Sequence, residues 1–78
     1  MSAERDPRNE QRPAPYDCQR LKAAREAAGL TQSTAAATAG ITQGYWSEVE
    51  AGQHVPALAT LAAMARAVGI PLHDLVEQ

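Results

Sequence analysis

The chain has 78 residues, enough for one small domain but too few for two. Apolar residues make up 45% of it, yet there is no phenylalanine and alanine supplies much of this share, which favours an all-helical fold. The formal net charge of −2 weighs against a dedicated nucleic-acid-binding protein, a class that is usually basic, and no apolar run approaches the roughly 20 residues of a membrane span.

The cysteine content and the N-terminal residues bear on the compartment in which the protein works. The single cysteine, Cys18, cannot form a disulfide within the chain, which fits a reducing environment. The first residues lack the apolar core of a secretory signal peptide. The sequence therefore predicts a cytoplasmic protein without a membrane partner.

Residues 1–15 form a proline-rich leader with interleaved acidic and basic residues and no large apolar residue beyond the first. Such a segment cannot bury enough surface to order itself, so we predict a disordered leader followed by one domain over 16–78. The alternative is an arm that reaches the DNA minor groove through Arg5, Arg8 and Arg12. The interleaved acids argue against that alternative.

The helical pattern begins after Tyr16, where Asp17 is suited to cap a first helix. Gly29 stands where a left-handed residue would end this helix, and Leu30 then forms a buried linker. The residues expected on its apolar face, at helical spacing, are Cys18, Leu21, Arg25 and Ala28.

Two short helices joined by a glycine turn are predicted next. Thr31 is a good cap for a second helix, which is mostly alanine and threonine and ends at Gly40. Thr42 can cap a third helix, which runs to about Glu50. This pattern is typical of a helix-turn-helix, whose second helix usually enters the major groove of DNA.

The last third of the sequence predicts two more helices. A loop through Pro56 leads to a fourth helix over 58–68, and Gly69 closes it. Pro71 suits the first turn of a short fifth helix. The residues expected to face the interior are Leu58, Leu61, Ala62, Ala65 and Val68 in the fourth helix, and Leu72, Leu75 and Val76 in the fifth.

Four segments in this order and spacing resemble the DNA-binding domain of the Cro/phage-repressor (XRE-type) helix-turn-helix family. They are 21–25, 29–32, Ala36 with Gly40 and Ile41, and Glu50 to Gly52 followed by Pro56, Leu58, Leu61, Ala65 and 68–70. The resemblance implies a compact, all-α, five-helix lambda-repressor-like domain. It also implies a transcriptional regulator, such as a repressor or small controller protein, that binds a double-stranded DNA operator as a homodimer.

The resemblance also implies which residues touch DNA, with the third helix as the recognition helix. The positions carried over are Gln32, Thr42, Gln43, Gly44, Tyr45, Ser47, Glu48, Gln53 and His54. Gln32 would meet phosphate at a helix N-terminus, and Tyr45 would lie near the sugar-phosphate edge. Gln43 could pair with adenine, and Glu48 could accept from a cytosine amino group. His54 could touch phosphate in a pH-dependent way, or be an ordinary exposed loop residue.

The same resemblance implies a structural ion pair between Arg25 and Glu50, which would tie the first helix to the recognition helix. The alternative for Glu50 is a solvated residue at a helix end. The family usually has larger residues at Ala35 and Ala39 and an Ile or Val where this chain has Trp46. We interpret these departures as coupled, with two small residues making room for a buried indole. The alternative is an exposed Trp46 that binds a ligand.

The charges near the recognition helix are unfavourable for DNA. Between Ile41 and Val55 there are two acidic residues and no lysine or arginine. Because neutralising phosphate supplies much of the affinity of DNA-binding proteins, we expect weak, salt-sensitive binding for a monomer. A dimer would add a second half-site.

Two other classes of function compete with DNA binding. A protein-interaction module or antitoxin-like partner-binding domain would keep the fold with weak DNA affinity and could use Tyr45 and Trp46 as its surface. An enzyme is disfavoured, because no nucleophile or phosphate-loop motif is present. One cysteine and two distant histidines, His54 and His73, fit no zinc spacing, so neither a metal nor another cofactor is expected.

Overall fold

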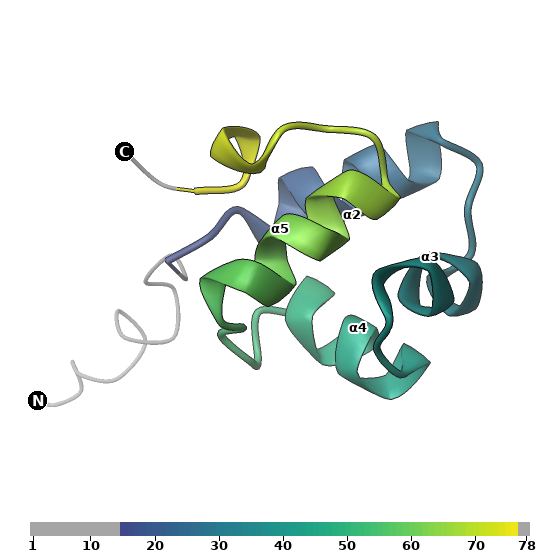
Figure 1. Cartoon of the computed structure of the whole chain (residues 1–78), viewed down its shortest axis with the longest axis horizontal. Helices are drawn as coiled ribbons and strands as arrows, with labels where there is room; N and C mark the ends of the chain where they lie inside the picture. The colour runs from purple at the N-terminus through teal and green to yellow at the C-terminus, as the bar shows by residue number, and fades with distance from the viewer. Residues whose placement is uncertain (1–14, 77–78) are drawn as a thin grey trace, which may run out of the picture.

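The structure is a computed structural model that describes residues 15–76. Within this range the chain forms four α-helices and one 3-10 turn (Figure 1). The elements are α2 (Cys18–Ala27), α3 (Gln32–Ala39), α4 (Gln43–Glu50), α5 (Leu58–Ala67) and η1 (Leu72–Asp74). The predicted all-helical class is confirmed. Apart from Pro15, the predicted leader lies outside the described residues.

The first three of these helices begin where the sequence predicts, because each has a side-chain cap. The side chains of Asp17, Thr31 and Thr42 each accept a hydrogen bond from the backbone N–H three residues further on, at 2.9, 3.0 and 3.1 Å. Such a bond satisfies one of the four N–H groups that a helix N-terminus leaves without a partner. The N-terminal residue of α5, by contrast, follows Ala57, which offers no side-chain cap.

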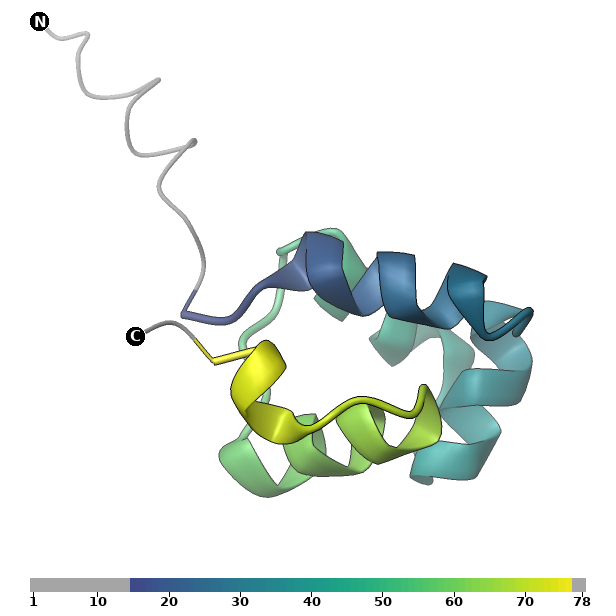
Figure 2. The ribbon, with the colours of Figure 1, turned by 90° about the horizontal axis from the view of Figure 1, so that it is seen from above.

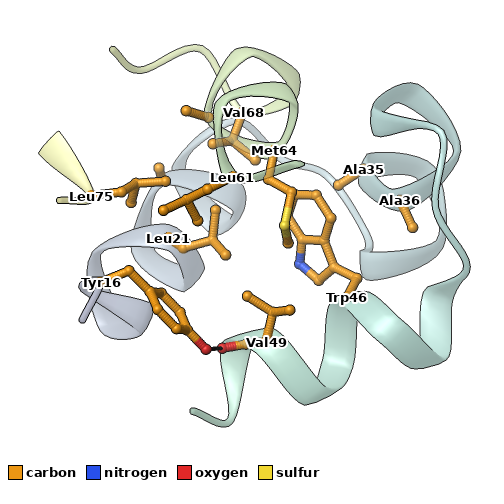
Figure 3. Packing of buried hydrophobic residues seen from close by; sticks show 12 residues of the cluster. Tyr16, Leu21, Ala35, Ala36, Trp46, Val49, Leu61, Met64, Val68 and Leu75 are labelled. Atoms are coloured by element: carbon orange, nitrogen blue, oxygen red, sulfur yellow. Dashed lines mark hydrogen bonds between the residues drawn. The ribbon is translucent and has the colours of Figure 1, made fainter. Parts of the chain in front are cut away.

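The four helices enclose one core, seen from close by in Figure 3. Its largest fully buried side chains are Trp46, Leu21, Met64, Leu75 and Val49. The indole of Trp46 lies beside Met64, between α4 and the helices above it in the figure. In Figure 2, α2 and α5 form the two long sides of the domain, and α3 lies at one end with η1 toward the other.

Two of the predicted apolar faces need correction. In α2, Ala24 is buried and Ala28 is exposed, because the helix ends at Ala27 and Ala28 lies beyond its last turn. In α5, Met64 is fully buried, whereas Leu58 is 63% exposed because the first turn of this helix directs Leu61 and not Leu58 into the core. Ala62, also expected inside, is only half-buried.

The predicted fifth helix is wrong: the chain makes a single 3-10 turn, η1, in its place. Leu75 is fully buried as expected, but its carbonyl accepts a hydrogen bond of 2.7 Å from the N–H of Asp17. The next residue, Val76, pairs with Tyr16 in an antiparallel bridge. These two contacts, together the terminal bridge, hold the backbone extended just where another helical turn would need it coiled.

Candidate nucleic-acid interface

The predicted helix-turn-helix is present as α3 and α4. Gly40 ends α3 with φ at +80°, a left-handed conformation that costs a residue with a side chain about 1–2 kcal/mol. The N–H of Ile41 donates to the carbonyl of Ala36 at 3.0 Å and closes the turn. The side chain of Thr42 then caps α4, so the start of the second helix is set by hydrogen bonds of the residues immediately before it.

Trp46 lies in the core with no exposed surface, so the alternative of an exposed tryptophan is wrong. Ala35 and Ala36 of α3 are also buried, and Ala39 packs against the same cluster. Small side chains on α3 thus accompany a large one on α4, as the sequence predicts. Tight packing of this kind fixes the angle between α3 and α4.

Glu50 is buried at the end of α4 and accepts four hydrogen bonds. Its Oε2 accepts from Nε of Arg25 and from the indole Nε1 of Trp46, both at 2.6 Å. Its Oε1 accepts from Nη2 of Arg25 at 3.2 Å and from Nε2 of Gln32 at 3.0 Å. The ion pair expected between Arg25 and Glu50 is therefore formed, and the alternative of a solvated Glu50 is wrong.

The protonation of this pair follows from those contacts. Burial alone would raise the pKa of Glu50, but hydrogen bonds from Arg25, Trp46 and Gln32 and the Arg25 charge together lower it below the ordinary value. The hydrogen bond to Glu50 raises the pKa of Arg25 against the opposing effect of burial. Both groups are charged at neutral pH, and removing either one would leave the other buried without its counter-charge.

Gln32 connects this buried pair to Gln43, in the first turn of α4. Its Nε2 donates to Glu50, and its Oε1 accepts from Nε2 of Gln43 at 3.3 Å. We call the five residues Arg25, Gln32, Gln43, Trp46 and Glu50 the Glu50 network. The sequence predicted only its ion pair. The i, i+4 spacing of Trp46 and Glu50 on one helix was the signal that could have added the indole.

The residues assigned to DNA contact are not equally accessible. Those that are exposed are Thr42, Gln43, Gly44, Glu48, Gln53 and His54. Tyr45 and Ser47 are half-buried, and so is Gln32. Gln53 lies beyond the helix, where its N–H donates to the carbonyl of Glu48 at 2.9 Å. The structure thus brings Gln32 and Gln43 together and leaves Gln53 in the following loop.

His54 has two neighbours that sequence reasoning did not foresee. Its ring meets the ring of Tyr45 edge-on, with centroids 4.8 Å apart. Its Nδ1 lies 3.8 Å from Oε1 of Glu48, so a protonated His54 would partly neutralise this acid on the recognition helix. The loop after α4 therefore folds back onto the exposed side of that helix.

The basic residues do not gather around α4. Arg20 pairs with Asp74 of η1 at 3.0 Å, which directs its charge toward the end of the domain away from α3 (Figure 1). Arg25 is committed to Glu50. Lys22 and Arg66 are exposed, one on α2 and the other in the last turn of α5. Weak attraction to phosphate therefore stays a prediction, and the positions of these four basic residues agree with it.

Tyr16 contacts the C-terminal end of α4 and the loop that follows it, a role that the sequence did not reveal. It is 2% exposed, and its hydroxyl lies 2.6 Å from the carbonyl oxygens of both Val49 and His54. The first of these bonds is drawn in Figure 3. Burial, with smaller contributions from Cys18 and Tyr45, raises the pKa of Tyr16 to about 12, so the hydroxyl stays a donor at neutral pH.

Cys18 and His73, candidate metal ligands in the sequence, have ordinary protein neighbours. Cys18 is half-buried against the core, and His73 is exposed beside Asp74 at 3.4 Å. Among residues 15–76 no group of histidine, cysteine and acidic side chains is arranged to hold a metal ion. No helix in that same range has the length and apolar character to cross a membrane.

Comparison with known proteins agrees with this geometry. The profile of a family described as "Helix-turn-helix domain" matches residues 19–78. The HTH-type transcriptional regulator DdrOP3 of Deinococcus deserti is 40% identical over 60 residues, covering 77% of this chain and 46% of that protein. The chain thus spans about half the length of this relative.

A solved structure is also similar. The restriction-modification controller protein C.AhdI from Aeromonas hydrophila superimposes with a TM-score of 0.70 at 35% sequence identity, over 73% of this chain and 83% of that one. The chain therefore belongs to the helix-turn-helix family, of the Cro and phage-repressor type.

Proposed function

We propose that this protein is a sequence-specific DNA-binding transcriptional regulator that inserts α4 into the major groove. The observation that carries the proposal is Gln43, which is exposed in the first turn of α4 and held there by Gln32. Membership of the helix-turn-helix family supports it. We favour the role of a repressor or small controller protein that acts on an operator in the cytoplasm.

We propose a specific division of work along α4. Gln43 reads adenine through its amide, Glu48 accepts from a cytosine amino group, and the methyl of Thr42 contacts thymine. Gly44 and Ser47 leave room for the edges of the bases. Tyr45, Gln53 and His54 lie toward the sugar-phosphate backbone, and Gln32 meets phosphate where its own hydrogen bonds leave space. The domain proper is 16–78, with the leader outside it.

We also propose that the protein binds DNA as a homodimer. Lys22 and Arg66 are too few to give a monomer strong attraction to phosphate, and a second copy doubles the contacts on a two-half-site operator. Leu75 is fully buried inside one chain, so it is not available as a dimer seam. Val55 and Leu58, 60% and 63% exposed, are the large apolar side chains that a second copy could cover.

The experiment is a salt titration of binding to a labelled DNA fragment from upstream of the gene, with random DNA as competitor. We expect a preference for that fragment and an affinity that falls with salt. Gln43→Ala should abolish the preference, while Gln19→Ala, an exposed glutamine on α2, should leave it unchanged.

The acidic balance favours one second candidate, a protein-interaction module or antitoxin-like partner-binding domain. Its surface would include exposed Val55 and Leu58, since Trp46 is buried and unavailable. Equal binding to operator fragment and random DNA at low salt would overturn the DNA-binding proposal and favour this one. A search for a protein partner that loses binding in Leu58→Asp would then follow.

A further inference from the structure

A continuous chain of hydrogen bonds runs from the core of the domain to the exposed face of α4. Trp46 and Arg25 donate to Oε2 of Glu50, each at 2.6 Å. Gln32 donates to Oε1 of the same carboxylate at 3.0 Å and accepts from Gln43 at 3.3 Å. Each bond in the chain runs one way only, with the donor on the side away from Glu50 and the acceptor on the side toward it.

The reason lies in the donors and acceptors of each group. An ionised carboxylate only accepts hydrogen bonds, whereas a glutamine amide can turn by 180° and present either its oxygen or its NH₂ group. Because Glu50 only accepts, Gln32 must turn its NH₂ group toward it. The oxygen of Gln32 then faces α4, so Gln43 must turn its own NH₂ group inward.

Glu50 is well suited to impose this order. Its residue surface is 9% exposed, and each of its oxygens accepts two hydrogen bonds, which fills its capacity as an acceptor. The indole N–H of Trp46 is one of these donors. An aliphatic side chain at position 46 would leave Oε2 with Arg25 alone.

The outward groups of Gln43 follow from this order. One Nε2 hydrogen is directed to Gln32, which leaves the second Nε2 hydrogen and Oε1 for the DNA. A donor beside an acceptor matches the N7 and N6 groups of adenine in the major groove. A Gln43 amide turned the other way would accept from Gln32 through one lone pair of Oε1 and leave both N–H groups and the second lone pair outward. The two N–H groups match the N7 and O6 acceptors of guanine.

We infer that Glu50 is a positioning residue for base recognition: through Gln32 it sets the orientation of the Gln43 amide and so selects adenine over guanine. This inference rests on the proposed DNA-binding function. Glu50 is buried and touches no base, yet it controls which base the exposed amide of Gln43 prefers.

The decisive variant is Glu50→Gln, which keeps the shape of the side chain. Arg25 and Trp46 would hold the amide oxygen of residue 50 at the Oε2 position, so its NH₂ group would face Gln32. Gln32 would then turn, Gln43 would turn after it, and the preference should move from adenine toward guanine. Adding Gln32→Glu should restore adenine, because a carboxylate at position 32 again only accepts from Gln43.

The readout is selection from randomised duplex DNA by the full chain, with the Gln43 base pair identified as the one whose preference is lost in Gln43→Ala. We expect the unaltered protein to favour adenine over guanine there by about tenfold or more. Glu50→Gln should reverse or abolish this ratio and the double variant should recover it, while preferences at the other positions persist. An unchanged adenine preference in folded Glu50→Gln would overturn the inference.

A second variant covers the case in which Glu50→Gln fails to fold. Gln32→Met leaves the Arg25–Glu50 ion pair intact but frees the Gln43 amide, so the adenine ratio should fall to within about threefold. Gln19→Met is the matched control and should retain it. A Gln32→Met protein that keeps the full ratio would sink the inference.

Failure of the DNA-binding proposal can be separated from failure of this inference. Side-chain amide signals in ¹⁵N NMR spectra of the DNA-free protein report on Gln32 and Gln43 directly. We expect both NH₂ groups to exchange more slowly with solvent than that of Gln19, and Glu50→Gln to shift both. No base preference with these signals as expected would refute DNA reading alone, whereas freely exchanging Gln32 and Gln43 amides would refute the inference alone.

Discussion

The Glu50 network and the hydroxyl of Tyr16 both hold the C-terminal part of α4, and they do so with different chemistry. The first uses a buried ion pair, and its Glu50 accepts four hydrogen bonds from three side chains. The second uses a neutral group, the hydroxyl of Tyr16, whose backbone takes part in the terminal bridge. The first extends through Gln32 to Gln43 in the first turn of α4, whereas the second reaches only Val49 and the loop at His54.

The position of a side chain and the orientation of its polar atoms are separate requirements. A neutral bond such as that of Tyr16 places the loop after α4, and the hydroxyl accommodates two carbonyl acceptors equally well. A carboxylate such as Glu50 also dictates which atom of its neighbour faces it. An interface that reads bases needs the second property, because a turned amide presents different groups to DNA.

Removing the indole should have the largest effect, because Trp46 belongs both to the core and to the Glu50 network. We expect Trp46→Ala to lower the free energy of unfolding by about 3–5 kcal/mol, through the cavity it leaves and the lost donor to Glu50. Urea denaturation followed by circular dichroism measures this. Leu58→Ala is the control and should change stability little, since Leu58 is 63% exposed. A cost for Trp46→Ala below about 1 kcal/mol would contradict the packing described.

Breaking the ion pair should be the next largest effect. We expect Arg25→Met to cost about 3 kcal/mol at pH 7, because it leaves Glu50 buried without its counter-charge. The pKa of Glu50 is lowered by folding, so its stabilisation is present above the unfolded value of about 4.3 and is lost as pH falls through the folded value. Arg25→Met should flatten this acid dependence.

The acid dependence is measured by urea titrations between about pH 2 and 6, a window around the unfolded glutamate pKa. Arg66→Met removes an exposed arginine and is the matched control. If Arg25→Met and Arg66→Met lose stability equally, the ion pair contributes nothing beyond an ordinary surface charge.

Tyr16→Phe should have a smaller effect on the free energy of unfolding, because the hydroxyl it removes is uncharged. Loss of the hydroxyl should cost about 1 kcal/mol at pH 7. Folding raises the pKa of Tyr16 to about 12 from about 10, so its contribution is lost as pH rises across that interval. Alkaline unfolding should therefore be shallower in Tyr16→Phe, whereas Tyr45→Phe should unfold like the unaltered protein.

Leu58→Asp should have the smallest effect on folding and should separate folding from self-association. Because Leu58 is exposed, we expect the unfolding free energy of the isolated chain to change by less than about 0.5 kcal/mol. Sedimentation equilibrium should show a weaker dimer. A folded Leu58→Asp protein that remains fully dimeric would place the seam elsewhere.

Features set by neighbouring residues could be predicted from the sequence. Thr31, Gly40 and Thr42 specify the two short helices through local caps and one left-handed residue, and the structure has these where predicted. The burial of Trp46 also followed from a pattern, the small residues that accompany it on α3.

Features that depend on contacts between distant segments could not. The 3-10 turn at Leu72–Asp74 replaces a helix because Tyr16 and Asp17, far away in sequence, bind the chain that follows it. Likewise Arg25 was predictable as a partner of Glu50 from the resemblance, but Gln32 donates to Glu50 only because α3 crosses the end of α4. Local spacing carries no information about which side chains meet at such a crossing.

The pairing of Tyr16 with Val76 places the two ends of the described chain next to each other (Figure 2). A short peptide joining residues on either side of that pair would close the domain into a ring without moving any helix. The unfolded ring would have fewer conformations than the unfolded open chain, so closure should favour the folded state. Opening the ring at another loop would change the order of the helices along the chain. The surface formed by α3 and α4 would stay the same.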